Sequence, residues 1–257
     1  MAKVLITGAS SGIGKELAYE FAKHKHDLLL VARRRELLEQ LCEEIKNEYH
    51  VEVHNYACDV TKDIDALFHY CHENNLKIDV LINNAGYGDY GEFINSDIDK
   101  LLGMIELNNK ALVNLTYRFV KENIDRGGHI INVGSVASFI PGPYMAVYYA
   151  TKSFVLNFSL ALREELKNKK FKVSVLCPAP TKTAFWDVAN GQTTILYDNF
   201  IARSSKQAAK TGYKIYEKNK PYSIDGLAYK LIIGFARILP PSLSAKMVGN
   251  TQKITKK

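Results

Sequence analysis

The stretch Val4-Leu5-Ile6-Thr7-Gly8-Ala9-Ser10-Ser11-Gly12-Ile13-Gly14 decides the fold of this chain. Its branched apolar residues predict a buried strand, and the turn that follows, with glycines spaced G-x-x-x-G-x-G, leads into a helical pattern over residues 12–24. Glycines let the backbone approach an anion closely, and free N–H groups at a helix N-terminus bind phosphate. Many glycine-rich turns are only tight connections, but a turn at the first strand–helix junction favours a phosphate site.

Outward from this turn, apolar and β-branched runs alternate with helical patterns along the chain, which is typical of strand–helix–strand units around a parallel sheet. The predicted strands cover residues 4–6, 27–31, 51–57, 80–83, 129–133, 172–177 and 222–224. The predicted helices lie near residues 12–24, 33–48, 62–75, 97–124, 146–169 and 226–239.

The chain carries no linker rich in Pro, Gly or Ser, so we expect one domain over residues 1–257. Residues 184–220 are polar and weakly patterned, and long inserts of this kind are usually functional. We therefore expect a substrate-binding loop or lid there. Residues 226–257 are expected to form an apolar helix followed by a basic tail.

Composition excludes several classes of protein. With 47% hydrophobic and 24% charged residues, the chain has material for a core and is neither disordered nor collagen-like. No apolar run approaches the roughly 20 residues that cross a bilayer, and the N-terminus runs directly into a predicted strand, so we expect no signal peptide. The cysteines have no paired spacing, which favours reduced thiols and a cytoplasmic location; they are Cys42, Cys58, Cys71 and Cys177.

Charge is unevenly distributed along the chain. Residues 200–257 hold 12 Lys or Arg and two acidic residues, for a net charge of +10, within a chain of net charge +7. This pattern indicates either a solvated basic tail, which we favour, or an anionic partner such as a lipid surface or acidic protein. Nucleic acid is disfavoured because no binding motif is present.

The last predicted helix, near residues 226–239, is apolar almost all round, apart from Lys230 and Arg237. It is too short to span a membrane. Burial against the same domain or a second copy of the chain is the favoured interpretation, and peripheral membrane contact is the less favoured one.

The end of the second predicted strand carries cations where dinucleotide-binding folds place an acid. The run is Ala32-Arg33-Arg34-Arg35, and no carboxylate follows until Glu36. An acid at this point bonds a ribose 2′-hydroxyl, whereas arginine accommodates a 2′-phosphate, so the run favours NADPH over NADH. The alternative is three arginines on the first turn of a solvated helix, a placement that opposes the helix dipole.

A serine selects one of several Tyr-x-x-x-Lys pairs. The pairs are Tyr19/Lys23, Tyr117/Lys121, Tyr148/Lys152 and Tyr216/Lys220. Only Tyr148 has a serine 13 residues upstream, Ser135, just past a predicted strand. Residues four apart share a helix face, so Tyr148 and Lys152 are able to reach one pocket, while spacing alone leaves Tyr144 and Tyr149 as competitors.

With these motifs the sequence resembles the short-chain dehydrogenase/reductase family from Thr7 to about Thr183, and most closely its bacterial ketone and aldehyde reductase branch. The resemblance rests on ordered motifs: TGASSGIG (7–14), Asp59-Val60, Asn83-Asn84-Ala85-Gly86, Asn108, Ser135 and Tyr148-x-x-x-Lys152. It implies a single Rossmann-type, doubly wound α/β domain. The implied sheet has seven mostly parallel strands in the order 3-2-1-4-5-6-7, with helices on both faces. A homodimer or homotetramer is also implied.

The resemblance further implies the NADPH-dependent interconversion of a carbonyl and an alcohol, and a role for each catalytic residue. Tyr148 would be the acid/base, with a pKa lowered from about 10 by the ammonium of Lys152, and Lys152 would also hold the nicotinamide ribose. Ser135 would polarise the carbonyl. Asn108 would support a proton-relaying water, although only the family register selects it over the neighbouring Asn109. The substrate is expected to be a small and apolar carbonyl or alcohol compound.

Cofactor contacts follow from the same resemblance. The residues concerned are Gly8, Ser10, Ser11, Gly12, Ile13 and Gly14 in the turn, Arg33 and Arg34 at the 2′-phosphate, Asp59 and Val60 at the adenine, Asn84, Ala85 and Gly86 on the adenosine side, Tyr148 and Lys152, and Pro178, Thr181 and Thr183 at the nicotinamide. Ala179 stands where the family usually has a glycine.

Two further groups of residues were weighed for a role in binding. His69, Cys71 and His72 do not share a helix face, so we expect no metal site. Aromatic residues near the catalytic segment are expected to be either pocket lining or core filler; with Pro143 they are Phe139, Tyr144, Phe185 and Trp186. Two rival functions are an NADPH-binding sensor or scaffold without catalysis and a membrane-surface interaction protein.

Overall fold

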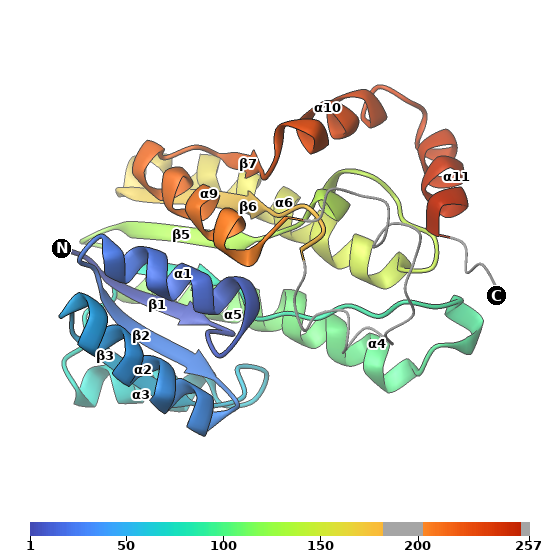
Figure 1. Ribbon diagram of the computed structural model, residues 1–257. Coiled ribbons are helices and arrows are strands. Elements are labelled where there is room, and N and C mark those ends of the chain that lie inside the picture. Colours follow the sequence, from blue (N-terminus) through green and yellow to red (C-terminus); the bar gives the residue numbers. More distant parts are fainter. Residues whose placement is uncertain (182–202, 253–257) are drawn as a thin grey trace.

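Short apolar runs form one parallel sheet in the computed structural model, which describes residues 1–181 and 203–252. The strands are β1 (Lys3–Thr7), β2 (Asp27–Ala32), β3 (Val53–Ala57), β4 (Val80–Asn83), β5 (Gly128–Val133), β6 (Phe171–Cys177) and β7 (Tyr222–Ile224). Their order is β3-β2-β1-β4-β5-β6-β7 and every pairing is parallel (Figure 1). The predicted α/β fold class and strand order are confirmed.

Helices cover both faces of the sheet (Figure 1). They are α1 (Gly12–Lys23), α2 (Arg35–Tyr49), α3 (Ile64–Glu73), α4 (Ile98–Ile105), α5 (Leu112–Glu122), α6 (Ala146–Leu166), α9 (Ser205–Lys218), α10 (Leu227–Ala236) and α11 (Pro241–Gln252). Shorter turns are η1 (Phe93–Asn95), η2 (Glu106–Ala111), η3 (Val136–Phe139) and η4 (Lys167–Lys169). Apolar side chains of α1, α2 and α9 share one core, and those of α3 and α5 share the core on the other face.

Strand β1 shows why its run is apolar throughout. Val4 and Ile6 are fully buried in the core of α1, α2 and α9, while Leu5 is buried in the core of α3 and α5. Successive side chains of a strand point to opposite faces, so a strand covered on both sides has no polar positions. The order of the strands reverses at β1: strands β2 and β3 are added on one side of it, and strands β4 to β7 on the other. In such folds ligands bind at the carboxyl ends of strands near this reversal.

Helix α9 lies inside the segment 184–220, where the sequence analysis expects a weakly patterned loop. Ser204 and Gln207 form a capping box at its start, a signal that the sequence does contain. The buried face of α9 combines Ala208, Ala209 and Gly212 with the larger Tyr213 and Ile215, and a Cβ on Gly212 would lie 2.8 Å from Leu17 Cδ2 of α1. Residues 182–202 lie outside the described part of the chain.

The long helical pattern over residues 97–124 is not one uniform helix. It consists of α4, the π-helical turn η2 and α5, which follow one another without a break. A π turn inserts an extra residue into the helix and rotates the side chains at that point; such turns are frequent at functional sites. Here the turn contains Asn108 and Asn109, both of which are buried.

The C-terminal helices sit at the same end of the molecule as the carboxyl ends of the strands (Figure 1). On α10, Tyr229 and Ile233 are buried in a core shared with α6 and β6. Other apolar residues of α10 are exposed. Among residues 1–181 and 203–252, no helix combines the length and apolarity needed to cross a bilayer.

Candidate active site

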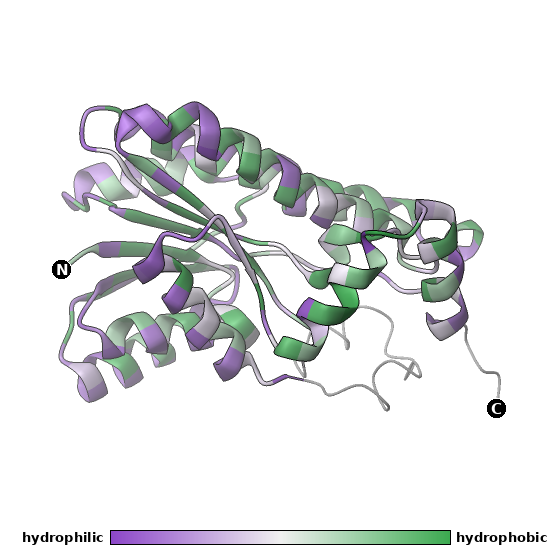
Figure 2. Ribbon diagram, turned by 90° about the horizontal axis from the view of Figure 1, so that it is seen from above, coloured by the Kyte–Doolittle hydropathy of each residue, from purple (hydrophilic) through white to green (hydrophobic). Residues whose placement is uncertain are grey.

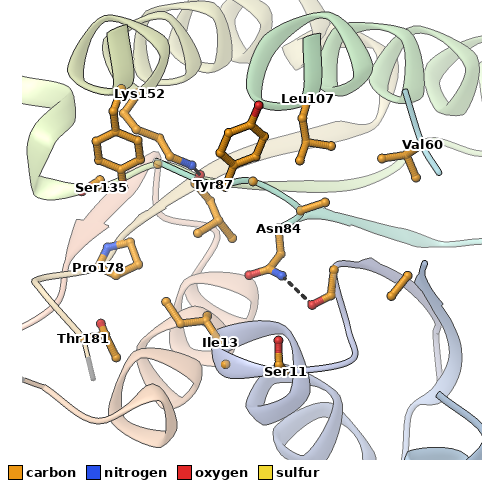
Figure 3. Close-up of a pocket in the computed structure, with 18 of the residues that line it drawn as sticks. Ser11, Ile13, Val60, Asn84, Tyr87, Leu107, Ser135, Lys152, Pro178 and Thr181 are labelled. Carbon is orange, nitrogen blue, oxygen red and sulfur yellow. Dashed lines mark hydrogen bonds between the residues drawn. The ribbon is translucent and has the colours of Figure 1, made fainter. Parts of the chain in front are cut away.

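A cavity of about 830 Å³ lies at the carboxyl ends of the strands, where the reversal at β1 predicts a site. It extends from Arg33 after β2, past the turn after β1, to Tyr148 and Lys152 on α6. Figure 3 shows side chains from the first turn of α1, the β4 loop, η2, β5 and α6 gathered around it. The cavity thus joins the segments that the sequence analysis treated as separate motifs.

The glycine-rich turn is held tightly against the loop that follows β4. Gly8 has φ +65°, and a Cβ there would lie 2.9 Å from Ala85 Cα. A Cβ on Gly14 would lie 2.3 Å from the carbonyl oxygen of Gly8. Asn84 Nδ2 donates to the carbonyl oxygens of Thr7 (2.9 Å) and Gly8 (3.2 Å) (Figure 3). Asn84 therefore holds the turn in place, and there is no room for a Cβ atom at Gly8 or Gly14.

The N-terminus of α1 faces the cavity with its N–H groups uncapped. Ser11 is the N-cap, but its side chain accepts no backbone hydrogen bond, and the first turn carries no acid. Ser11, Gly12 and Ile13 line the cavity. A helix N-terminus in this state has partial positive charge and free donors, which suits a phosphate group.

Cations gather at the end of the cavity beside β2. Arg34 donates to Ser10 Oγ (3.0 Å) and to Ser11 Oγ (2.9 Å), which joins the β2 loop to the glycine-rich turn. Helix α2 begins at Arg35, so Arg33 and Arg34 precede it and line the cavity. The alternative of three arginines on a solvated helix turn therefore fits Arg35 alone.

Asp59 is the carboxylate at this end of the cavity. Burial opposes its ionisation, but hydrogen bonds from Thr61 N (3.0 Å) and Thr61 Oγ1 (2.8 Å) and the charge of Arg33 outweigh burial and lower the pKa of the carboxyl. Val60 lines the cavity beside it. The ionised Asp59 carboxylate is thus stabilised by hydrogen bonds within its own loop and by the charge of Arg33.

At the opposite end of the cavity, Ser135, Tyr148 and Lys152 come together. Ser135 Oγ accepts from Ala137 N (3.1 Å), which holds the side chain at the start of η3. A hydrogen bond joins Ser135 to the hydroxyl of Tyr148. Lys152 Nζ donates to the carbonyl oxygen of Val133 (2.8 Å) and lies 5.9 Å from the centre of the Tyr148 ring. The predicted spacing does bring these three side chains to one place.

Burial decides the protonation of this group. It raises the pKa of Tyr148 to about 12, against the hydrogen bond from Ser135, and it lowers the pKa of Lys152 to about 8. Desolvation of the phenol thus outweighs the groups that lower its pKa, and the net lowering expected from Lys152 is not found in this structure. Tyr148 is protonated at neutral pH, the state that a proton donor needs.

The two competing tyrosines are engaged elsewhere. Tyr149 Oη accepts from Gln252 Nε2 (2.7 Å) at the end of α11, and its ring packs over Gly142, where a Cβ would lie 2.4 Å from the ring. Tyr144, with φ +66°, lies with its ring centre 6.4 Å from that of Tyr90. Tyr148 is the tyrosine that hydrogen-bonds Ser135.

The π turn separates the roles of the two adjacent asparagines. Asn108 Oδ1 accepts from Tyr87 N (3.1 Å), and its Nδ2 donates to Tyr87 O (3.0 Å) and Thr151 Oγ1 (3.1 Å). Asn109 instead donates to the carbonyl oxygen of Thr151 (3.0 Å). A Cβ on Gly86 would lie 2.8 Å from Asn108 Oδ1 and 3.6 Å from Lys152 Nζ. Asn108 is therefore the asparagine that adjoins Lys152.

The remaining predicted residues fall into two groups. Those that line the cavity are Ala85, Pro178 and Thr181. Ala179, which replaces the expected glycine, is buried and has no positive φ, so the alanine is not strained. Those that lie outside the described residues are Thr183, Phe185 and Trp186.

The aromatic and apolar residues that line the cavity differ from those that the sequence predicts. Phe139, Pro143 and Tyr144 are not among its lining residues; the ring centre of Phe139 lies 5.6 Å from that of Tyr222. Lining residues that sequence reasoning missed are Tyr87, Leu107, Met145 and Gln252, whereas Tyr149 entered it only as a competitor of Tyr148. No local pattern marks Gln252, which lies 103 residues beyond its partner Tyr149.

The weighed metal ligands are dispersed. His69 Nε2 pairs with Glu73 (3.1 Å) and His72 Nε2 with Glu122 (3.0 Å), while Cys71 is buried in the core. Within residues 1–181 and 203–252, no three His, Cys, Asp or Glu side chains converge on a point where a metal ion could sit.

Comparison with known proteins assigns the family. The family model described as short chain dehydrogenase matches residues 2–193, so the chain belongs to the short-chain dehydrogenase family. The specific reductase branch stays a prediction.

Individual relatives and solved structures agree with this assignment. The chain is 31% identical to human 17-beta-hydroxysteroid dehydrogenase type 3 over 92% of this chain and 74% of that protein. It is 36% identical to an NADP-dependent 3-hydroxy acid dehydrogenase of Schizosaccharomyces pombe, over 71% of this chain and 72% of that protein. A solved short-chain dehydrogenase from Sphingobium yanoikuyae in complex with NADPH has a TM-score of 0.81 and 30% identity, and the alignment covers 100% of this chain and 98% of that one.

Proposed function

We propose that this protein is an NADPH-dependent oxidoreductase that interconverts a ketone or aldehyde with an alcohol. The observation that carries the proposal is one cavity with Arg33 and Arg34 at one end and the Ser135–Tyr148–Lys152 group at the other. The NADPH in the Sphingobium yanoikuyae structure and the name of the NADP-dependent relative support the cofactor.

The residues along the cavity fit NADPH. The uncapped N-terminus of α1 suits the pyrophosphate, and Arg33 and Arg34 suit a 2′-phosphate, which a guanidinium binds in a fork. Lys152 and Thr181 line the end at which the nicotinamide would lie. When bound there, NADPH supplies the hydride.

Each catalytic side chain then has one task. Ser135 Oγ donates a hydrogen bond to the substrate carbonyl oxygen and so favours the charge that develops on it. Tyr148, protonated at neutral pH because burial raises its pKa to about 12, donates its proton to that oxygen. In the reverse direction Tyr148 accepts the proton.

Lys152 and Asn108 form the proposed route by which Tyr148 regains a proton. Asn108 Oδ1 accepts one hydrogen bond and keeps a second lone pair, so it is able to hold a water between itself and Lys152. The glycine at position 86 leaves this space free, because a Cβ would lie 2.8 Å from Asn108 Oδ1.

The substrate is proposed to be apolar. Beside Tyr148 the cavity is lined by Met145 and Tyr149, and by Gln252, which donates to Tyr149 Oη. The steroid named for the human relative is consistent with such a lining. The part of segment 184–220 before α9 is proposed to complete the substrate site.

We also propose a homodimer or homotetramer. Helices α4, α5 and α6 carry exposed apolar side chains that a second copy would cover: Ile98, Leu102, Tyr117 and Phe154. Light scattering after gel filtration tests this assembly, and a monomeric mass would contradict it. The cytoplasmic location stays a prediction.

The first test is a pair of binding titrations with NADPH and NADH. Arg33→Ala should weaken NADPH binding about 10-fold or more, since hydrogen bonds to charged groups contribute about 1.5–3 kcal/mol, and leave NADH binding unchanged. Arg35→Ala is the matched control, because that side chain is exposed on α2 and pairs with Glu39. Equal affinity for both nucleotides would refute the assignment of the 2′-phosphate site.

The second test is NADPH oxidation with a panel of ketones and aldehydes. Tyr148→Phe should abolish turnover and leave NADPH binding nearly intact. Tyr117→Phe is the control, because Tyr117 has the same Tyr-x-x-x-Lys spacing but is exposed on α5. NADPH binding without turnover of any carbonyl would favour the sensor function instead.

A further inference from the structure

The side of α10 that faces away from the protein is apolar. Tyr229 and Ile233 anchor the helix in the core, and the most exposed large side chains lie on the opposite side: Leu227 (74% exposed), Leu231 (70%), Phe235 (61%) and Ile238 (83%). These positions recur at intervals of three or four residues, so they form one stripe. Figure 2, which views the molecule from the side of α10, shows the helix in green along most of its length. A surface helix in water has the reverse arrangement.

Helix α11 also exposes apolar side chains. Leu243 (44% exposed) and Met247 (49%) are four residues apart on α11. We call the exposed apolar residues of α10, of the link after it and of α11 the C-terminal apolar face; they are Leu227, Leu231, Phe235, Ile238, Leu243 and Met247. Exposed apolar surface of this extent marks a contact with a protein or a membrane.

The charges carried by α10, α11 and the link between them all have one sign, and the acid that lines a pocket beside Lys246 is Glu92, from the loop after β4. Lys230, Arg237 and Lys246 are exposed, and residues 226–252 contain no Asp or Glu. The acid that immediately precedes them, Asp225, is 1% exposed and is paired with Arg203, so it does not offset these cations. An exposed apolar stripe flanked by cations matches an anionic lipid surface, with acyl chains for the stripe and headgroups for the cations.

A second copy of the chain matches this face less well. Two such faces packed symmetrically would bring Lys230 and Lys246 of both copies together with no carboxylate on the face to pair with them. A span through the bilayer is excluded by length, since the 10 residues of α10 are half of the roughly 20 that are needed.

We propose that the C-terminal apolar face docks the protein on the surface of an anionic lipid bilayer. Helix α10 then lies in the plane of the interface with its exposed stripe among the acyl chains. The face adjoins the catalytic end of the cavity: the Arg237 guanidinium lies 5.7 Å from the centre of the Phe139 ring in η3, which Ser135 precedes. Gln252, at the end of α11, lines the cavity itself. If the proposed function holds, an apolar substrate dissolved in the bilayer reaches the site from this side.

The test is co-sedimentation of the full chain with vesicles, which needs neither cofactor nor turnover. Vesicles of phosphatidylcholine alone are compared with vesicles that also contain the anionic lipid phosphatidylserine. We expect sedimentation with the anionic vesicles, weaker binding at high salt, and little binding to phosphatidylcholine alone. No sedimentation with anionic vesicles at low salt would overturn the proposal.

Variants locate the contact. Leu231→Gln with Phe235→Gln should weaken vesicle binding by at least about 10-fold, since each side chain removes apolar area that would enter the bilayer. Lys230→Glu with Lys246→Glu should abolish the preference for anionic lipid. The control is Leu37→Gln with Ile124→Gln, two exposed apolar residues on α2 and after α5. Because all of these side chains are exposed, the melting temperature should not change.

The outcomes separate the occupants of the face. Equal loss of binding in the control pair, or full binding by the α10 pair, would overturn the assignment to this face. If the α10 pair lowers the mass measured by light scattering and vesicles bind neither protein, the face is a contact between copies and the lipid proposal is wrong.

Discussion

Acidification should destabilise the protein through His129, which is buried near the amino end of β5. Burial lowers the pKa of His129 to about 3, and the charges of Lys172 and Arg163 act in the same direction. Its Nε2 shares a hydrogen bond with Ser174 Oγ (2.9 Å), while Nδ1 has no partner, so a proton added there would be buried without an acceptor. The folded protein therefore keeps His129 neutral at pH values where the unfolded chain protonates it.

The sign and size follow from proton linkage. Between pH 6.5 and pH 3 the unfolded state binds about one more proton at this position, so the free energy of unfolding rises with pH and falls on acidification. Each pH unit well below 6.5 costs about 1.4 kcal/mol, and the change from pH 6.5 to pH 4.5 costs about 2 kcal/mol. This is a large share of the roughly 5–15 kcal/mol that stabilises a typical domain.

The assay is urea unfolding followed by circular dichroism at pH 6.5 and pH 4.5. His129→Gln retains a group able to hydrogen-bond Ser174 but does not titrate, so its loss of stability between the two pH values should be about 2 kcal/mol smaller than that of the wild type. His69→Gln is the control, since that side chain is 72% exposed. Burial also lowers the pKa of His26, but His26 is present in the wild type and in both variants, so its contribution cancels in the comparison. The same loss in His129→Gln and wild type would refute the reasoning.

Three other predictions concern the turn, the lysine and a buried ion pair. Gly14→Ala places a Cβ 2.3 Å from Gly8 O, so NADPH binding measured by titration should be lost while circular dichroism still reports a folded chain; retained affinity would contradict the tight turn. Because burial lowers the pKa of Lys152 to about 8, kcat/KM for carbonyl reduction should decline above that pH, and a flat profile to pH 10 would argue against a role for its charge. Arg203 Nη2 lies 2.9 Å from Asp225 Oδ1, and that carboxylate is 1% exposed, so Arg203→Met should lower the free energy of unfolding by about 3 kcal/mol. A loss below about 0.5 kcal/mol, as for a surface ion pair, would show that the pair is not a buried one.

The sequence predicted most of the fold because its signals are local. The turn needs glycine at Gly8 for a positive φ and at Gly14 for a close approach to the carbonyl oxygen of Gly8, and both requirements arise within one strand–helix connection. Tyr148 and Lys152 meet because residues four apart share a helix face. Helix α9 escaped prediction, although Ser204 and Gln207 form its capping box and the sequence therefore carries a local signal for its start.

Other features of the site depend on residues that lie far apart in the chain and meet only in the folded protein. The choice of Asn108 over Asn109 follows from a π turn packed against α6, and Gln252, the last described residue, reaches the cavity from the end of α11. The raised pKa of Tyr148 is also tertiary, because desolvation depends on every group that surrounds the phenol.

The same distinction applies to the C-terminal helix. Its sequence determined an apolar helix that is too short to cross a membrane, while the structure decided that Tyr229 and Ile233 are buried and that Leu231 and Phe235 are exposed. Backbone conformation and the spacing of side chains on one element are set by short-range sterics and hydrogen bonds, so a sequence determines them directly. Burial and exposure are set by which elements pack together, and only the folded chain decides that.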